Sequence, residues 1–129
     1  KVAHALARNF GWTIVPCGDT ALNLLGLSTQ VPSQWVYVSD GAYKEYTFDN
    51  TTIKFKRTTN KEISKVSYKT ALTIQALKAL GKENITEQVI LRLKKILTDE
   101  EKEKMLAESK SATSWVLELI KIICKDEEK

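Results

Sequence analysis

Apolar residues at the start of the chain recur every four positions, and the pattern then changes to a short continuous run. At this spacing Val2, Leu6 and Phe10 share one face of a helix, and Gly11 follows them as a residue that commonly ends helices. Residues 12–15 form a compact run of aromatic and β-branched side chains. We therefore expect a first helix that ends at Phe10, followed by a short strand.

A second, shorter helix is expected directly after this strand. Asp19 is the candidate N-cap, because its carboxylate can accept backbone N–H groups of the first turn. Gly26 is the expected end of the helix. The spacing predicts four buried apolar side chains, namely Ala21, Leu22, Leu24 and Leu25.

The middle of the chain predicts a buried strand over residues 35–38 and then a hairpin. The pair Asp49–Asn50 suits a tight two-residue turn, because both residues tolerate positive φ. Folding there pairs an aromatic with an aliphatic residue and an acid with a base, namely Tyr46 with Ile53 and Glu45 with Lys54. The packed face of the hairpin is then expected to carry Tyr46, Phe48, Ile53 and Phe55.

The second half of the sequence is patterned as helices. Residues 68–80 are apolar almost all round, with Ser67 before them and Gly81 after them, which is typical of a helix in the middle of a domain. Two further helix starts resemble capping boxes, Asn84 with Glu87 and Thr98 with Glu101. A strongly amphipathic helix is expected last. Together these elements predict an α+β fold in which a small, mainly antiparallel sheet with a hairpin packs against several helices, with a helical C-terminal half.

Composition is that of a single globular domain over residues 1–129. Hydrophobic residues make up 43% and charged residues 28%, and no apolar run is long enough for a membrane span, so we expect a cytoplasmic protein. The first residue is Lys1, so we expect either a domain cut from a longer protein or, as the alternative, a processed chain. Cys17 and Cys124 match no metal-ligand spacing. They are expected to be reduced thiols, with a disulfide joining the two ends of the chain as the alternative.

Charge is distributed unevenly along the chain. The net charge is +4, and basic residues gather in one stretch of the middle, namely Lys54, Lys56, Arg57, Lys61, Lys65 and Lys69. Lys54 and Lys56 share one face of the predicted strand, and a helical continuation would align Lys61, Lys65 and Lys69. Convergent cations suit a phosphate backbone or an acidic protein surface. The alternative is a solvated face that keeps the protein soluble.

Catalytic patterns are missing from the sequence. His4 is the only histidine, and there is no phosphate-binding loop, dinucleotide fingerprint or nucleophile elbow. The acids nearest the predicted sheet, Asp40, Glu45 and Asp49, lie at turns or opposite a lysine. We therefore expect no enzyme activity, no catalytic residue, no cofactor and no metal site.

One long block makes the sequence resemble the bacterial AbiEi-type antitoxin and transcriptional-regulator family. The block is Gly-Asp-Thr-Ala-Leu-Asn-Leu-Leu-Gly-Leu-Ser-Thr-Gln-Val-Pro at residues 18–32. It follows an Ala-Leu-Ala-Arg helix and a Gly-Trp strand, and it precedes a Tyr-Val-Ser-Asp-Gly turn at residues 37–41 and a basic strand at residues 53–57. The resemblance spans most of the chain and is strongest over residues 5–57.

The resemblance implies a type IV toxin–antitoxin system, or more broadly phage defence, as the setting. Such proteins join an N-terminal winged helix-turn-helix, which reads DNA, to a C-terminal domain like this one, and they have a nucleotidyltransferase-like toxin as functional partner. The winged helix is absent from this chain, which puts direct operator recognition by the domain alone in doubt.

Three functions follow from the sequence. The first is the regulatory and interaction domain of an AbiEi-like antitoxin and autoregulator. The second is a nucleic-acid-binding module that uses the basic stretch over residues 54–69, with Lys54, Lys56, Arg57, Lys61 and Lys65 as the binding residues. The third is a degenerate metal-dependent nuclease.

Overall fold

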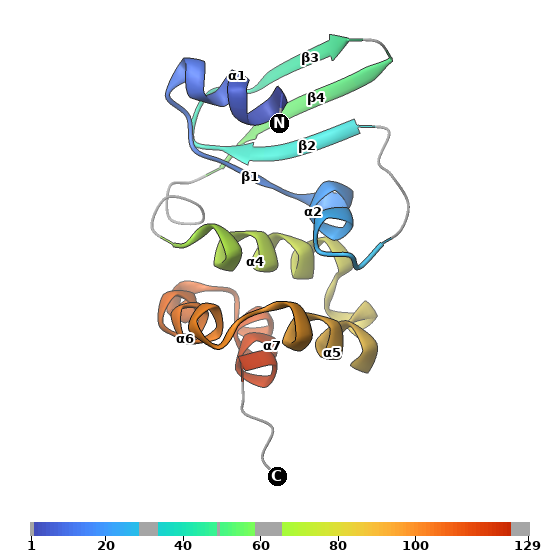
Figure 1. Cartoon of the computed structure of the whole chain (residues 1–129), viewed down its shortest axis with the longest axis vertical. Coiled ribbons are helices and arrows are strands. Elements are labelled where there is room, and N and C mark those ends of the chain that lie inside the picture. Colours follow the sequence, from blue (N-terminus) through green and yellow to red (C-terminus); the bar gives the residue numbers. More distant parts are fainter. Residues whose placement is uncertain (1, 29–33, 49, 59–65, 125–129) are drawn as a thin grey trace.

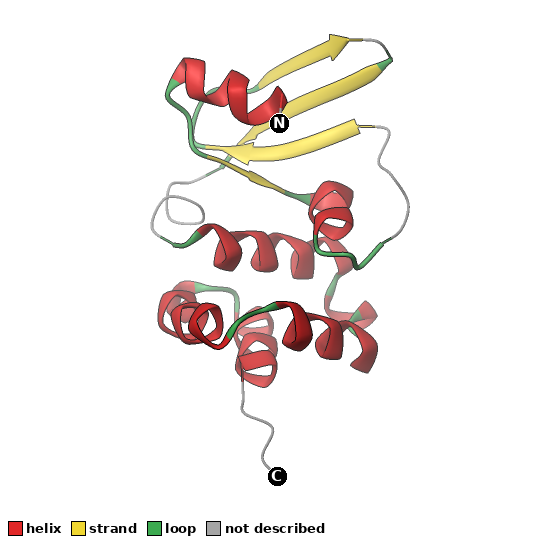
Figure 2. Cartoon of the chain, in the orientation of Figure 1, coloured by secondary structure: helices red, strands yellow, loops and turns green. Residues whose placement is uncertain are grey.

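The computed structural model describes residues 2–28, 34–48, 50–58 and 66–124. Its helices and strands follow one another as α1 (Val2–Phe10), β1 (Ile14–Pro16), α2 (Gly18–Leu24), β2 (Gln34–Ser39), β3 (Lys44–Phe48), β4 (Thr51–Arg57), α4 (Tyr68–Leu80), α5 (Glu87–Ile96), α6 (Asp99–Glu108) and α7 (Ser114–Cys124). The strands gather in one half of the molecule and α4–α7 in the other (Figures 1 and 2). The fold is α+β, as the sequence predicts.

The four strands form one sheet in the order β1-β2-β4-β3. β1 pairs antiparallel with β2, and β3 pairs antiparallel with β4, so two of the three strand pairs are antiparallel. β2 and β4 are parallel, because the chain leaves β2, runs to the outer position as β3 and returns to the centre as β4. The sheet is therefore mixed but mainly antiparallel.

The hairpin has the predicted register. Tyr46 pairs with Ile53 and Glu45 with Lys54, and the innermost pair is Phe48 with Thr51, which leaves two residues in the turn. Asn50 adopts a φ of 67°, as the turn requires. Asp49 and the side chain of Phe48 lie outside the described part of the structure. The turn chemistry and the cross-strand pairs thus act together to define this register.

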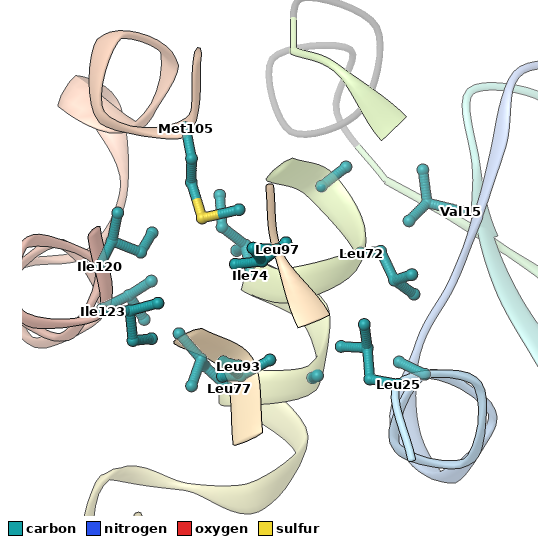
Figure 3. Packing of buried hydrophobic residues seen from close by; sticks show 14 of the residues in the cluster. Val15, Leu25, Leu72, Ile74, Leu77, Leu93, Leu97, Met105, Ile120 and Ile123 are labelled. Atoms are coloured by element: carbon teal, nitrogen blue, oxygen red, sulfur yellow. The ribbon is translucent and has the colours of Figure 1, made fainter. Parts of the chain in front are cut away.

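Among the described residues, buried hydrophobic side chains form two clusters. The smaller one lies between α1 and the sheet and contains Ala3, Ala7, Ile14, Tyr37, Ile53 and Phe55. The larger one surrounds α4 and joins it to α2, β1 and the three C-terminal helices. In Figure 3, Leu72 of α4 lies on the side of Val15 and Leu25, whereas Ile120 and Ile123 of α7 approach α4 from the opposite side. α4 is the central helix that its apolar sequence predicts.

The sequence predicts the presence of each helix better than the residue at which the helix begins. The Thr98–Glu101 capping box is present, with both reciprocal hydrogen bonds at 2.9 and 3.1 Å. The prediction for Asn84 was wrong. α5 begins after Thr86, whose hydroxyl accepts the N–H of Val89, and the Asn84 amide instead donates to the carbonyl of Leu80 at the end of α4.

The predictions for α2 also need two corrections. Asp19 is not the N-cap: the helix begins at Gly18, with Cys17 before it, because Cys17 still donates its N–H to Val36 across the sheet. Leu24 is 50% exposed rather than buried, since α2 turns only one side toward α4 and that side carries Ala21 and Leu25.

Candidate nucleic-acid interface

β4 separates apolar and basic side chains by simple strand alternation. Ile53 and Phe55 are buried against the α1 layer, and Phe55 is completely inaccessible to solvent. Lys54 and Lys56 therefore lie on the opposite face of the sheet, where Lys54 is half-buried and Lys56 is exposed. The structure brings together these two lysines of the predicted site.

The remaining predicted basic residues do not join this pair within the described structure. Arg57 is exposed, but alternation directs it to the same face as Phe55. Lys61 and Lys65 lie outside the described residues. Lys69, which the sequence aligned with them, lies in the first turn of α4 and forms an ion pair with Glu101 of α6 at 3.6 Å. The described interface is therefore narrower than the sequence pattern indicated.

Hydroxyl-bearing side chains adjoin the two lysines. On the same face of the hairpin, β3 contributes Glu45 and Thr47, and the register sets Glu45 opposite Lys54 and Thr47 opposite Thr52. We call Glu45, Thr47, Thr52, Lys54 and Lys56 together the hairpin outer face. Sequence reasoning missed the two threonines, although the predicted register already placed them opposite one another.

The helices leave the hairpin outer face open. α2 packs against β2 and α4 against β1, so these helices lie below the other half of the sheet. Figure 1 shows β3 and β4 extending away from them, with α1 on the opposite face. Glu45, Thr47 and Lys56 are exposed, and Thr52 and Lys54 are half-buried. Side chains on this face are available to a partner.

The carboxylates near the sheet have structural partners. The carboxylate of Asp40 accepts the backbone N–H of Thr13 at 2.9 Å, and Glu45 accepts the hydroxyl of Tyr43 at 3.2 Å. Among the described residues, no group of three or more histidine, cysteine or acidic side chains is arranged to hold a metal ion. The arrangement offers hydrogen-bonding and charged groups for binding.

The two cysteines are buried, whereas His4 is exposed. His4 contacts the rings of Tyr37 and Tyr68, and partial burial lowers the pKa of His4, with the charge of Arg8 acting in the same direction. Cys17 and Cys124 are buried free thiols, which excludes the alternative of a disulfide between them. Burial raises the pKa of both thiols, while Lys56 partly opposes this effect at Cys17. Both cysteines are thus poor nucleophiles.

The residues that carry the family resemblance have mainly structural roles. The hydroxyl of Thr20 accepts the N–H of Val36 at 2.8 Å, and Gly26 has a φ of 73° with the Arg92 guanidinium directly above it. In the turn after β2, the buried hydroxyl of Ser39 accepts the N–H of Gly41 at 2.9 Å. A methyl group on Gly41 would overlap the indole of Trp12. Residues of this block therefore form contacts that join the sheet to the helices.

These features define a class of protein. It is an α+β domain whose hairpin has an open face with lysines, and in which residues of the family-like block join the sheet to the helices. The sequence profile of DUF6088, a family of unknown function, matches residues 1–105, and the chain therefore belongs to this family. Neither a curated protein nor a solved structure matches the chain. In the described part of the chain, no helix combines the length and the apolar character needed to cross a bilayer.

Proposed function

We propose that this domain is the regulatory and interaction part of an AbiEi-like antitoxin and transcriptional autoregulator in the bacterial cytoplasm. Its action is binding, with no catalytic step. The resemblance of residues 5–57 to that family supports the setting, and the basic overall charge of +4 supports an acidic or nucleic-acid partner.

One observation carries the proposal more than any other. Lys54 and Lys56 project side by side from a central strand onto a part of the sheet that the helices leave uncovered. A mainly antiparallel sheet can pack one face on the core and leave the other in solvent, and cations on the solvated face are available to a partner. A surface for recognition is a physical reason to keep the strand open there.

Toxin neutralisation in cells tests the proposal directly. The chain is co-expressed with the nucleotidyltransferase-like toxin that the proposal expects to be encoded beside its gene, and growth is followed. Wild-type protein is expected to restore growth, and the Lys54→Ala/Lys56→Ala variant is expected to restore it less well. The matched control is Lys82→Ala/Lys110→Ala, which removes the same charge from two exposed lysines away from the sheet. Unchanged toxicity with well-expressed wild-type chain would contradict the proposal.

The second candidate function is a nucleic-acid-binding module that uses residues 54–69. The same lysine pair favours it, because lysines on an open strand face can bind backbone phosphates. The two candidates differ in the partner. A regulator of the first kind retains toxin neutralisation even when DNA binding by this domain is negligible, whereas a pure nucleic-acid module does not neutralise the toxin at all.

A further inference from the structure

The hairpin outer face has the dimensions of a ribbon that enters a DNA groove. It belongs to two antiparallel strands joined by a two-residue turn. Neighbouring strands lie about 4.8 Å apart, and alternate side chains along a strand are about 6.8 Å apart. The major groove of B-form DNA is about 12 Å wide and admits a two-stranded ribbon. The hairpin also extends beyond α2 and α4, so these helices do not block an approach from its open side (Figure 1).

The side chains on this face can read base edges as well as bind phosphates. Thr47 and Thr52 lie directly opposite one another, and each offers a hydroxyl that donates and accepts and a methyl group that can pack on the methyl of thymine. Lys54 can donate to the guanine edge, and Glu45 can accept from the amino group of cytosine.

The charge pattern favours duplex DNA over other partners. The face carries two lysines against one glutamate, and the chain as a whole carries +4. The deep, narrow major groove of A-form RNA excludes a ribbon of this width. An acidic protein would match the lysines, whereas duplex DNA offers phosphates to the lysines and also base edges to the threonine hydroxyls.

We propose that the hairpin outer face enters the major groove of duplex DNA. Thr47 and Thr52 contact base edges, and Lys54 and Lys56 hold the ribbon against the bases and the adjoining backbone. This inference deepens the proposed function, on which it rests, because an autoregulator must recognise its own operator. It assigns part of that recognition to this domain.

The test measures binding of the purified chain to two labelled duplexes by fluorescence anisotropy. One carries the sequence upstream of the protein's own gene, and the other is a scramble of the same composition. Salt of about 50 mM is used first, because phosphate contacts weaken steeply as salt rises. A double variant, Thr47→Val/Thr52→Val, removes both hydroxyls and keeps side-chain shape and strand propensity. Thr51→Val is the matched control, because Thr51 lies on β4 but on the opposite face.

The two kinds of substitution have different expected effects. The valine double variant should lose about tenfold or more of the preference for the upstream duplex, with its salt dependence unchanged. Lys54→Ala/Lys56→Ala should weaken binding to both duplexes and reduce the salt dependence. Thr51→Val should match wild type. Far-ultraviolet circular dichroism of each variant confirms that the fold is intact.

Three outcomes would overturn the inference: no preference for either duplex in the wild type, a preference that survives the valine double variant, or equal binding to an RNA duplex. Toxin neutralisation without any DNA binding would contradict this inference but not the proposed function. Sequence-preferring DNA binding without toxin neutralisation would contradict the proposed function but not this inference.

Discussion

The backbone N–H of Val36 donates a hydrogen bond to the side-chain hydroxyl of Thr20, with 2.8 Å between nitrogen and oxygen. Three residues before Thr20, Cys17 donates its N–H to the carbonyl of the same Val36 and so ends the β1–β2 ladder. Thr20, completely buried in the first turn of α2, thus takes the place of a strand partner. The helix that opens the family-like block is therefore attached to the sheet by a side chain.

Thr20→Val is predicted to destabilise the domain by about 1–3 kcal/mol, because the Val36 N–H loses its acceptor in a partly buried site. Thr20→Ser is the matched control. It retains the acceptor and removes one buried methyl group, worth about 1 kcal/mol. Urea unfolding followed by tryptophan fluorescence measures both. Equal losses in the two variants would show that packing, and not the hydrogen bond, is what matters at this position.

Gly41→Ala is predicted to cost about 1–3 kcal/mol, because its new methyl group would overlap the indole of Trp12. The effect should depend on that ring. In a Trp12→Leu background the same substitution should cost clearly less, so a double-mutant cycle by chemical denaturation should show coupling between the two positions. Additive effects would mean that the cost of Gly41→Ala comes from the backbone conformation at Gly41 and not from overlap with Trp12.

Glu108 is predicted to make stability depend on acid pH. Its carboxylate accepts both the N–H and the hydroxyl of Ser67, each at 2.9 Å, and so joins α6 to the start of α4. Burial raises the pKa of Glu108, but the hydrogen bonds from Ser67 and Thr70 and the charge of Lys104 outweigh burial and hold it below its ordinary value. A pKa that is lower in the folded state means stability that is present at neutral pH and lost as pH falls through the folded pKa.

Glu108→Gln should therefore lower the free energy of unfolding at pH 7 and have less effect at acid pH, where the native carboxyl is protonated. The exposed Glu103 of the same helix provides the control, Glu103→Gln. Thermal unfolding from neutral pH down to about pH 3, below the usual glutamate pKa, measures the difference. A parallel shift of the Glu108→Gln curve at all pH values would contradict an ionic role for this carboxylate.

Binding of duplex DNA by the isolated domain is predicted to be weak at physiological salt and to strengthen at low salt. Each neutralised phosphate contributes a slope of about −0.9 in log affinity against log salt, so the two lysines of the hairpin outer face would together contribute about −2. Lys54→Ala/Lys56→Ala should reduce the slope by about two. A salt titration by anisotropy measures this. Tight, sequence-selective binding at physiological salt would contradict the prediction of weak binding, and a slope unaffected by the substitutions would exclude the lysine pair from the interface.

The domain is predicted to be inert as a hydrolase. With magnesium or manganese, the purified chain should leave DNA, RNA and nucleotides intact, because Asp40 and Glu45 are engaged by Thr13 and Tyr43. Gel electrophoresis and chromatography of the reaction mixtures check this. Metal-dependent turnover would support the nuclease hypothesis if Asp40→Asn or Glu45→Gln abolished it.

Features that depend on neighbours in the chain were predictable from the sequence. The hairpin register follows from the Asp49–Asn50 turn and from alternation on each side of it, and the central position of α4 follows from its apolar surface. The separation of Lys54 and Lys56 from Phe55 belongs to the same group, because it requires only the two-residue period of a strand.

Tertiary structure alone decided how these pieces meet. Sequence patterns state which side chains share a face but not which strand lies beside β4. Its parallel pairing with β2, which leaves the lysines on an uncovered part of the sheet, is a long-range choice. The same reason explains why Thr20 bonds to Val36 and why Glu108 reaches Ser67 across 41 residues. Local residues specify local periods and turns, whereas contacts between distant segments depend on how the buried faces of all elements are covered at once.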